Sequence, residues 1–207
     1  MKMTNNIAFT SRINFVNAKT FENFRCGTYI DFRKGSEIVT PTFPRPDIYK
    51  TDEFFTDEIR TCTAGGVIDS KNGQCLGFHI YDNLTNEENV GNIIENIFKL
   101  IPNPDKALLL GSKKLACAKY SPTIFQKIYK GLSSGIKNIT VFKEHIFPIS
   151  ESSLHYSLKN DTWTIHSMYR GFLNLKEQDL ISESELQKCF KEIILSPNDT
   201  IHFDKLT

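Results

Sequence analysis

The sequence lacks an excess of charge of either sign. Its 25 lysine and arginine residues are balanced by 24 aspartate and glutamate residues, which gives a formal net charge of +1. It also contains no block of like charge, the feature that nucleic-acid-binding domains and polybasic membrane-binding segments usually carry. We therefore expect neither a nucleic acid nor a membrane surface among its partners.

Long apolar runs and metal-ligand motifs are missing as well. No stretch reaches the length of a membrane span, and the first residues contain no apolar run of the kind found in secretory signals. The five cysteines are odd in number and scattered, so we expect reduced thiols in a cytoplasmic compartment. No Cys-x-x-Cys or His-x-x-x-His spacing occurs, and the sequence predicts neither a metal nor a cofactor.

The apolar pattern predicts an α+β protein with mixed, largely antiparallel sheets flanked by helices. Alternating residues predict strands, and residues spaced three and four apart predict helices. The predicted strands are 62–68, 74–81, 107–110, 137–144, 154–158 and 162–168, with weaker signals at 7–16 and 27–32. The predicted helices are 85–100, 121–134 and 182–194. Strands and helices in this order favour a sheet with helices packed against it.

The 207 residues are enough for one domain, or for one domain plus a small appendage. We divide the chain into an N-terminal segment, 1–53, a core, 54–170, and a C-terminal helix and tail, 171–207. The first segment contains a proline-rich loop at 40–46, which we expect to cross the surface in an extended conformation. We expect the N-terminal segment to pack on the core.

The strands 62–68 and 74–81 are predicted to form a hairpin that carries the chemistry. They are joined by Asp69-Ser70-Lys71-Asn72-Gly73, whose Asn-Gly pair suits the left-handed conformations of a tight turn. Cys62 begins the first strand, and His79 lies near the end of the second. A hairpin folds these two ends together, and a thiol beside an imidazole is the smallest nucleophile–base pair for attack on a carbonyl carbon.

The residues around this hairpin resemble a known family. The pattern Thr56…Thr61-Cys62…Asp69…Gly73…Gly77-Phe78-His79 is similar to that of the chemotaxis receptor-glutamine deamidases, the CheD family. It is similar, more distantly, to the catalytic domains of the cytotoxic necrotizing factor toxins. The order of elements after the hairpin also agrees, so the resemblance covers roughly residues 54–168.

This resemblance implies a CheD/CNF-like fold and hydrolysis of a glutamine side-chain amide on a protein substrate. Cys62 would be the nucleophile, His79 the general base and acid, and Thr56 the residue that orients the imidazole. Backbone N–H groups near Cys62 would stabilise the oxyanion, with Gly65 and Gly66 allowing close approach.

Arg60-Thr61 stands where the chemotaxis family usually has Gly-Ser, which argues against a chemoreceptor enzyme and fits a relative with another target or one that has lost activity. A toxin-like bacterial effector that contributes to virulence, delivered into a host cell without a cleavable signal, would fit this description.

Other interpretations remain open. An amine in place of water would make the same site a transglutaminase. A papain-like protease would use Cys62 with His145, His155 or His166 and with Asn160 or Asp161, but the residues after Cys62 are a poor helix start, which that class needs. Cys75 is a rival nucleophile, only four residues before His79 on the same strand. A non-catalytic protein-binding module on the same fold is the alternative from another class.

Overall fold

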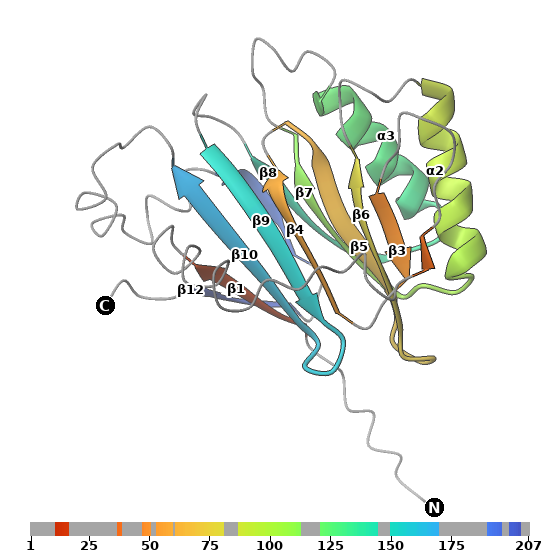
Figure 1. Ribbon diagram of the computed structural model, residues 1–207, viewed down its shortest axis with the longest axis horizontal. Helices are drawn as coiled ribbons and strands as arrows, with labels where there is room; N and C mark the ends of the chain where they lie inside the picture. Colours follow the sequence, from red (N-terminus) through yellow and green to blue (C-terminus); the bar gives the residue numbers. More distant parts are fainter. Residues whose placement is uncertain are drawn as a thin grey trace, which may run out of the picture.

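Two β-sheets packed face to face, with two helices outside one of them, make up the described part of the chain (Figure 1). The computed structural model describes residues 11–16, 37–38, 47–50, 53–59, 61–80, 87–112, 121–144, 150–169, 190–195 and 199–203. The layers follow one another as sheet, sheet and helices. The predicted α+β class with mixed sheets is confirmed.

The first sheet has five strands within the described residues. Their order is β12 (Thr200–Phe203), β1 (Arg12–Val16), β10 (Thr162–Tyr169), β9 (Ser150–Ser157) and β4 (Glu53–Ile59). The strand β9 runs antiparallel to both of its neighbours, whereas β1 runs parallel to both of its own. The strand β4 therefore forms one edge of this sheet.

The second sheet has seven strands within the described residues. Their order is β11 (Phe190–Ile194), β8 (Asn138–Glu144), β7 (Lys106–Gly111), β5 (Thr63–Asp69), β6 (Gln74–Ile80), β3 (Asp47–Lys50) and β2 (Glu37–Ile38). Only β7 and β8 pair in parallel among these strands, and the predicted hairpin is the antiparallel pair β5–β6. The central strand β5 is hydrogen-bonded on both sides.

The helices α2 (Glu87–Leu100) and α3 (Ser121–Ser133) cover the outer face of the seven-stranded sheet. The helix α3 connects the parallel strands β7 and β8, as a crossover helix must. Each helix buries one apolar stripe. These stripes contain Val90, Ile93 and Ile97 in α2 and Ile124, Phe125, Ile128 and Leu132 in α3.

Two separate apolar cores follow from the alternation of side chains along the central strands. One core lies between the sheets and contains Ala64 and Ile68 from β5 together with Tyr156 and Trp163 from the first sheet. The other lies under the helices and contains Val67. The side chains of β5 therefore point alternately toward these two cores, because successive side chains of a strand point to opposite faces.

The two ends of the sandwich differ in character. The turn between β5 and β6 and the turn between β9 and β10 lie at one end, drawn at the bottom of Figure 1, which we call the turn end. Cys62 directly precedes β5 and lies at the opposite end. We call this the cysteine end. It also contains the last residues of β6, β7 and β8.

Most predicted elements occur, with ends that move by up to five residues. One prediction is wrong within the described residues: 190–194 form the strand β11, not the end of a helix. Apolar residues in a run this short fit either structure, and pairing with β8 satisfies backbone groups that the sheet edge would expose. The predicted strand 27–32, the proline-rich loop 40–46 and residues 182–189 lie outside the described residues. No helix in the described part is long and apolar enough to span a membrane.

Candidate cysteine–histidine site

His79 points into the layer between the two sheets. Side chains alternate along β6, so Cys75 and His79 share the face toward the five-stranded sheet, whereas Leu76 and Phe78 pack under the helices. The His79 side chain is buried, with only 4% of its surface exposed. An imidazole at this depth requires a hydrogen-bond partner for its ring, because an unsatisfied buried polar group is costly.

Thr56 provides such a partner from the opposite sheet. Its Oγ1 atom lies 2.6 Å from Nδ1 of His79, and both side chains are buried. When Nδ1 carries the ring proton, it donates to Thr56 and leaves Nε2 with the lone pair that a general base needs. The structure thus brings together two of the three predicted site residues, which are 23 positions apart in the sequence.

Two glycines, which have no side chains, allow the strands that carry Thr56 and His79 to approach closely. Gly66 and Gly77 pair across the β5–β6 ladder, and the ring of Phe54 lies against them. A Cβ atom on Gly77 would approach this ring to 2.6 Å, and one on Gly66 would approach it to 3.0 Å. Phe54 precedes Thr56 by two residues, as Gly77 precedes His79. The strands β4 and β6 therefore make two contacts. The Phe54 ring packs on Gly77, and the Thr56 hydroxyl contacts the His79 imidazole.

The regular pairing of β4 is interrupted directly after Thr56. The register of β4 against β9 shifts between Thr56 and Ile59. Bulges of this kind are common at sheet edges, where they bend a strand and redirect its side chains. The bulge thus follows the residue whose hydroxyl meets His79.

Cys62 lies in a bend directly before β5, the strand that pairs with the strand of His79. It is a reduced thiol with 7% of its surface exposed. Ala64 pairs with His79 across the ladder, and Cys62 precedes Ala64 by two residues. The alternation of β5, continued by two residues, places Cys62 diagonally across from His79 on the same face. Diagonal neighbours are roughly 7–8 Å apart between Cα atoms, which an aromatic ring can span.

The end of β7 packs closely against Cys62. A Cβ atom on Gly111 would lie 2.7 Å from the carbonyl oxygen of Cys62, and Gly111 has a φ of +149°. The next residue, Ser112, is buried and has a φ of +70°, a left-handed conformation that residues with side chains rarely adopt. The backbone beside Cys62 therefore has little freedom to shift.

Burial lowers the pKa of His79 to about 4, well below its ordinary value of 6.5. The cause is desolvation, which disfavours the charged imidazolium. His79 is consequently neutral at pH 7, and a negative charge beside it, such as that of a thiolate, is what would stabilise its protonated form.

The predicted role of Gly65 and Gly66 in substrate approach does not fit the structure. The space beside Gly66 is filled by the rings of Phe54 and Trp163, and the space beside Gly65 by Leu108 and Phe78. Both glycines also belong to the central strand β5, whose backbone groups pair with the strands on either side. They allow close packing of the protein's own layers, and oxyanion donors must come from elsewhere.

The rival residues lie apart from His79. Cys75 is 1% exposed and pairs with Ile68 near the turn end, roughly 13 Å along β6 from His79. Along β9, Leu154 and Tyr156 point into the inter-sheet core, so His155 points to the opposite face of its sheet. His166 lies in β10, outside the residues whose side chains are described, and His145 lies outside the described residues altogether.

A second polar contact joins the two sheets at the cysteine end. Glu144, the last residue of β8, accepts a hydrogen bond from the hydroxyl of Ser152 on β9, and both side chains are buried. The sequence analysis did not select either residue. A carboxylate at the end of a predicted apolar strand was the only available signal, and it is a weak one.

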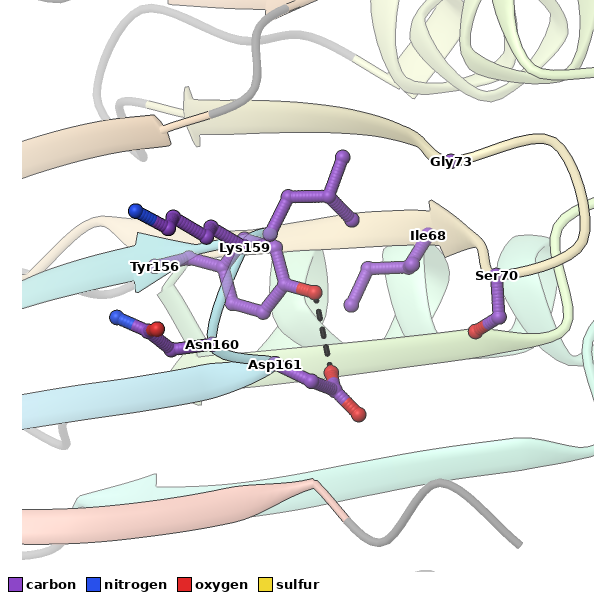
Figure 2. A pocket seen from close by; sticks show the side chains of 8 residues that line it. Ile68, Ser70, Gly73, Tyr156, Lys159, Asn160 and Asp161 are labelled. Atoms are coloured by element: carbon purple, nitrogen blue, oxygen red, sulfur yellow. Dashed lines mark hydrogen bonds between the residues drawn. The ribbon is translucent and has the colours of Figure 1, made fainter. Parts of the chain in front are cut away.

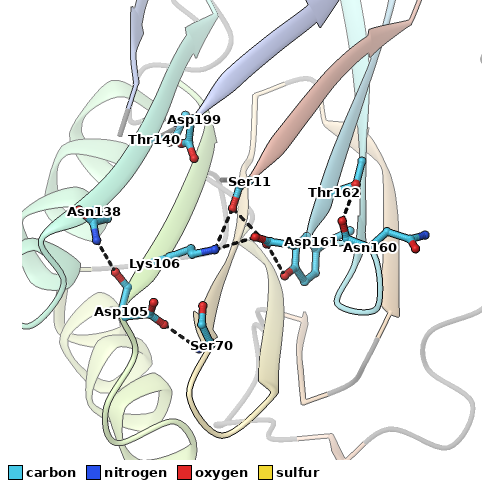
Figure 3. A network of polar contacts seen from close by, with 11 residues as sticks. Ser11, Ser70, Asp105, Lys106, Asn138, Thr140, Asn160, Asp161, Thr162 and Asp199 are labelled. Carbon is cyan, nitrogen blue, oxygen red and sulfur yellow. Dashed lines mark hydrogen bonds and ion pairs between the residues drawn. The ribbon is translucent and has the colours of Figure 1, made fainter. Parts of the chain in front are cut away.

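The turn end has a different set of polar groups. Figure 3 shows Lys106 reaching across from the seven-stranded sheet to Ser11 and Asp161, with its Nζ atom 2.7 Å from Oδ2 of Asp161. The hydroxyl of Tyr156 donates to Oδ1 of Asp161, and burial raises the pKa of this phenol above its usual range. Asp161, which the protease interpretation would use, therefore belongs to an ion-pair network that ties the sheets together.

A cavity of about 230 Å³ lies beside this network (Figure 2). Its lining comes from the two turns and from the strand ends beside them and includes Ile68, Tyr156 and Lys159, but none of the predicted catalytic residues. Ile68 in β5 and Cys62, directly before β5, are six residues apart, which is roughly 20 Å of extended chain. The cavity is therefore distant from the cysteine–histidine site.

The described residues contain no group of three or more histidine, cysteine, aspartate or glutamate side chains that could hold a metal ion. A comparison with protein-family models finds no match, and a search of curated proteins finds no sequence relative. The function must therefore be inferred from the residues themselves.

Proposed function

We propose that the protein is a protein-glutamine deamidase that uses Cys62, His79 and Thr56, and that its fold is CheD/CNF-like. The buried contact between Thr56 and His79 carries this proposal, because it supplies an oriented, neutral imidazole on the strand beside the cysteine. When Nδ1 carries the proton and donates it to the Thr56 hydroxyl, Nε2 carries the lone pair of the base. The resemblance around the hairpin independently assigns these same three residues.

The reaction takes place in two steps that use one water molecule. The sulfur of Cys62 attacks the carboxamide carbon while His79 takes the thiol proton, and the C–N bond then breaks as His79 returns that proton to the leaving ammonia. Water, deprotonated by His79, next attacks the thioester and releases a glutamate side chain and the thiol. No oxidant, metal or cofactor takes part.

Two observations favour this function over a papain-like protease. Cys62 precedes a β-strand in the structure, whereas a helix N-terminus would lower the thiol pKa in that class. His155 lies on the face of its sheet that points away from His79. A transglutaminase remains chemically equivalent up to the thioester, because it differs only in using an amine in place of water.

The test measures conversion of glutamine to glutamate in a mixture of folded proteins. Mass spectrometry locates the converted glutamines, and the released ammonia gives their total. We expect wild type to convert specific glutamines, and we expect Cys62→Ser and His79→Ala to convert none. Cys75→Ala is the matched control, since it removes the other described thiol and should retain activity. Conversion that persists in Cys62→Ser would contradict the proposal, as would its loss in Cys75→Ala in a protein of unchanged stability. Adding a primary amine separates amide exchange from hydrolysis.

A further inference from the structure

Buried polar side chains on the inter-sheet face gather at the cysteine end. Thr56 and Ser152 come from the adjacent strands β4 and β9, where Thr56 pairs with Leu154, the second residue after Ser152. Each of these hydroxyls contacts a titratable side chain of the opposite sheet, Thr56 with His79 and Ser152 with Glu144. The two contacts are therefore close neighbours across the sandwich.

Glu144 and Cys62 lie on the same sheet with one strand between them. The strand order is β8, β7, β5 and β6, so Glu144 is two strands from Cys62, and Cys62 lies between Glu144 and His79. Phe142 belongs to the core between the sheets, and the alternation of β8 gives Glu144 the same orientation. Two inter-strand spacings amount to about 10 Å between the backbones.

This separation fits one carboxamide group. A thiol in position to attack lies about 3 Å from the carbonyl carbon, and an N–H donor lies about 3 Å from the oxygen that accepts its hydrogen bond. A glutamine side chain whose carbon faces Cys62 would therefore present its NH₂ group toward Glu144.

Glu144 is also an unusual residue for a structural role. Only 4% of its surface is exposed, and burying a carboxylate is costly unless hydrogen bonds compensate for the lost water. Its hydrogen bond with Ser152 holds one oxygen in place. A carboxylate accepts hydrogen bonds and cannot donate them, so a site that contains one selects for donors.

We propose that Glu144 recognises the substrate carboxamide, accepting a hydrogen bond from its NH₂ group while Ser152 positions the carboxylate. This inference rests on the proposed deamidase function. It also explains product release, because hydrolysis replaces the neutral amide with a glutamate carboxylate that Glu144 repels. Glu144 is thus a specificity residue for amide over acid.

The experiment uses two small probes that differ as substrate and product do. Iodoacetamide carries a neutral amide and iodoacetate carries a carboxylate, and both alkylate a thiol by displacing iodide. The quantity measured is the ratio of their rates at Cys62, followed by mass spectrometry on the full-length protein. A charge about 8 Å away at an effective dielectric constant of about 20 changes this ratio by at least about tenfold.

We expect Glu144→Gln to lower the preference for iodoacetamide by about tenfold and Glu144→Asp to retain most of it. Glu192→Gln is the matched control, because Glu192 lies on the adjacent strand β11, pairs with Lys143 and is partly exposed. This control should leave the ratio unchanged. Ser152→Ala keeps the charge of Glu144 but removes the hydrogen bond that positions it, so this variant should give an intermediate ratio. It replaces Glu144→Gln as the test if Glu144→Gln does not fold.

An unchanged ratio in folded Glu144→Gln or Ser152→Ala, with Cys62 still reactive, would overturn the role of Glu144 and leave the deamidase proposal standing. A change of equal size in Glu192→Gln would overturn it too, since the effect would then reflect overall charge. If neither probe labels Cys62 in the wild type, both the deamidase proposal and this inference fail.

Discussion

Lowering the pH from 7 to 4.5 should cost the protein about 2–3 kcal/mol of stability through His79 alone. The folded-state pKa of His79 is about 4, whereas the unfolded chain has the ordinary value of 6.5. Below pH 6.5 the unfolded state therefore binds a proton that the folded state excludes, so stability falls as the pH falls toward 4. The difference of roughly 2.5 pKa units corresponds to about 3 kcal/mol, most of which is lost by pH 4.5.

Urea unfolding at pH 7 and pH 4.5 measures this loss. The variant His79→Gln cannot titrate but keeps a polar group beside Thr56, so its loss between the two pH values should be about 2–3 kcal/mol smaller than that of wild type. Carboxylates such as Asp69, whose pKa is lowered by the Asn72 side-chain hydrogen bond, contribute equally to both proteins. His155→Gln retains His79 and should behave as wild type. Equal losses in wild type and His79→Gln would refute the burial argument.

Two further substitutions test the packing that surrounds the site. Gly77→Ala forces a methyl group against the Phe54 ring, so we expect the free energy of unfolding in urea to fall by roughly 1–3 kcal/mol and Cys62 to be alkylated more slowly. Unchanged values would show that the contact between Phe54 and Gly77 does not position the site residues. Gly91→Ala, in open space on α2, is its control and should stabilise the protein by about 0.5–1 kcal/mol. Asp161→Asn keeps a residue that tolerates the φ of +44° but removes the ion pair with Lys106, and should cost roughly 1–3 kcal/mol, whereas a neutral result would make the network dispensable.

The β5–β6 hairpin could be predicted because its signals are local. Alternating side chains, the Asp69 carboxylate and the Asn72-Gly73 pair all lie within a few residues of one another. In the structure Asp69 accepts hydrogen bonds from the backbone and side chain of Asn72, which explains the motif's acidic residue as a turn cap. Local chemistry of this kind leaves a clear trace in the sequence.

Contacts between the two sheets could not be predicted in the same way. The resemblance selected Thr56. Its contact with His79 forms where Phe54 packs on Gly66 and Gly77 between the two sheets. The sequence contains both glycines and the aromatic ring, yet nothing in the pattern indicates that they meet.

The contact between Glu144 and Ser152 was missed for a related reason. These residues lie eight positions apart on different sheets, with no motif between them. The strand β11 was mistaken for the end of a helix because a five-residue apolar run has no decisive period, and pairing with β8 settled its structure. Short segments take their conformation from tertiary partners more than from their own pattern.

The most direct test of the Cys62–His79 pair is the pH dependence of Cys62 alkylation by iodoacetamide, in wild type and in His79→Ala. All five cysteines are followed by mass spectrometry, so the other four serve as internal references. An ordinary thiol titrates near pH 8.5 and reacts about a hundredfold more slowly at pH 6 than at pH 8.5. We predict that Cys62 of wild type stays reactive at pH 6, since a thiolate and an imidazolium in contact stabilise each other, and that His79→Ala follows the ordinary profile. A wild-type Cys62 that is unreactive, or that follows the ordinary profile with or without His79, would contradict the proposed catalytic pair.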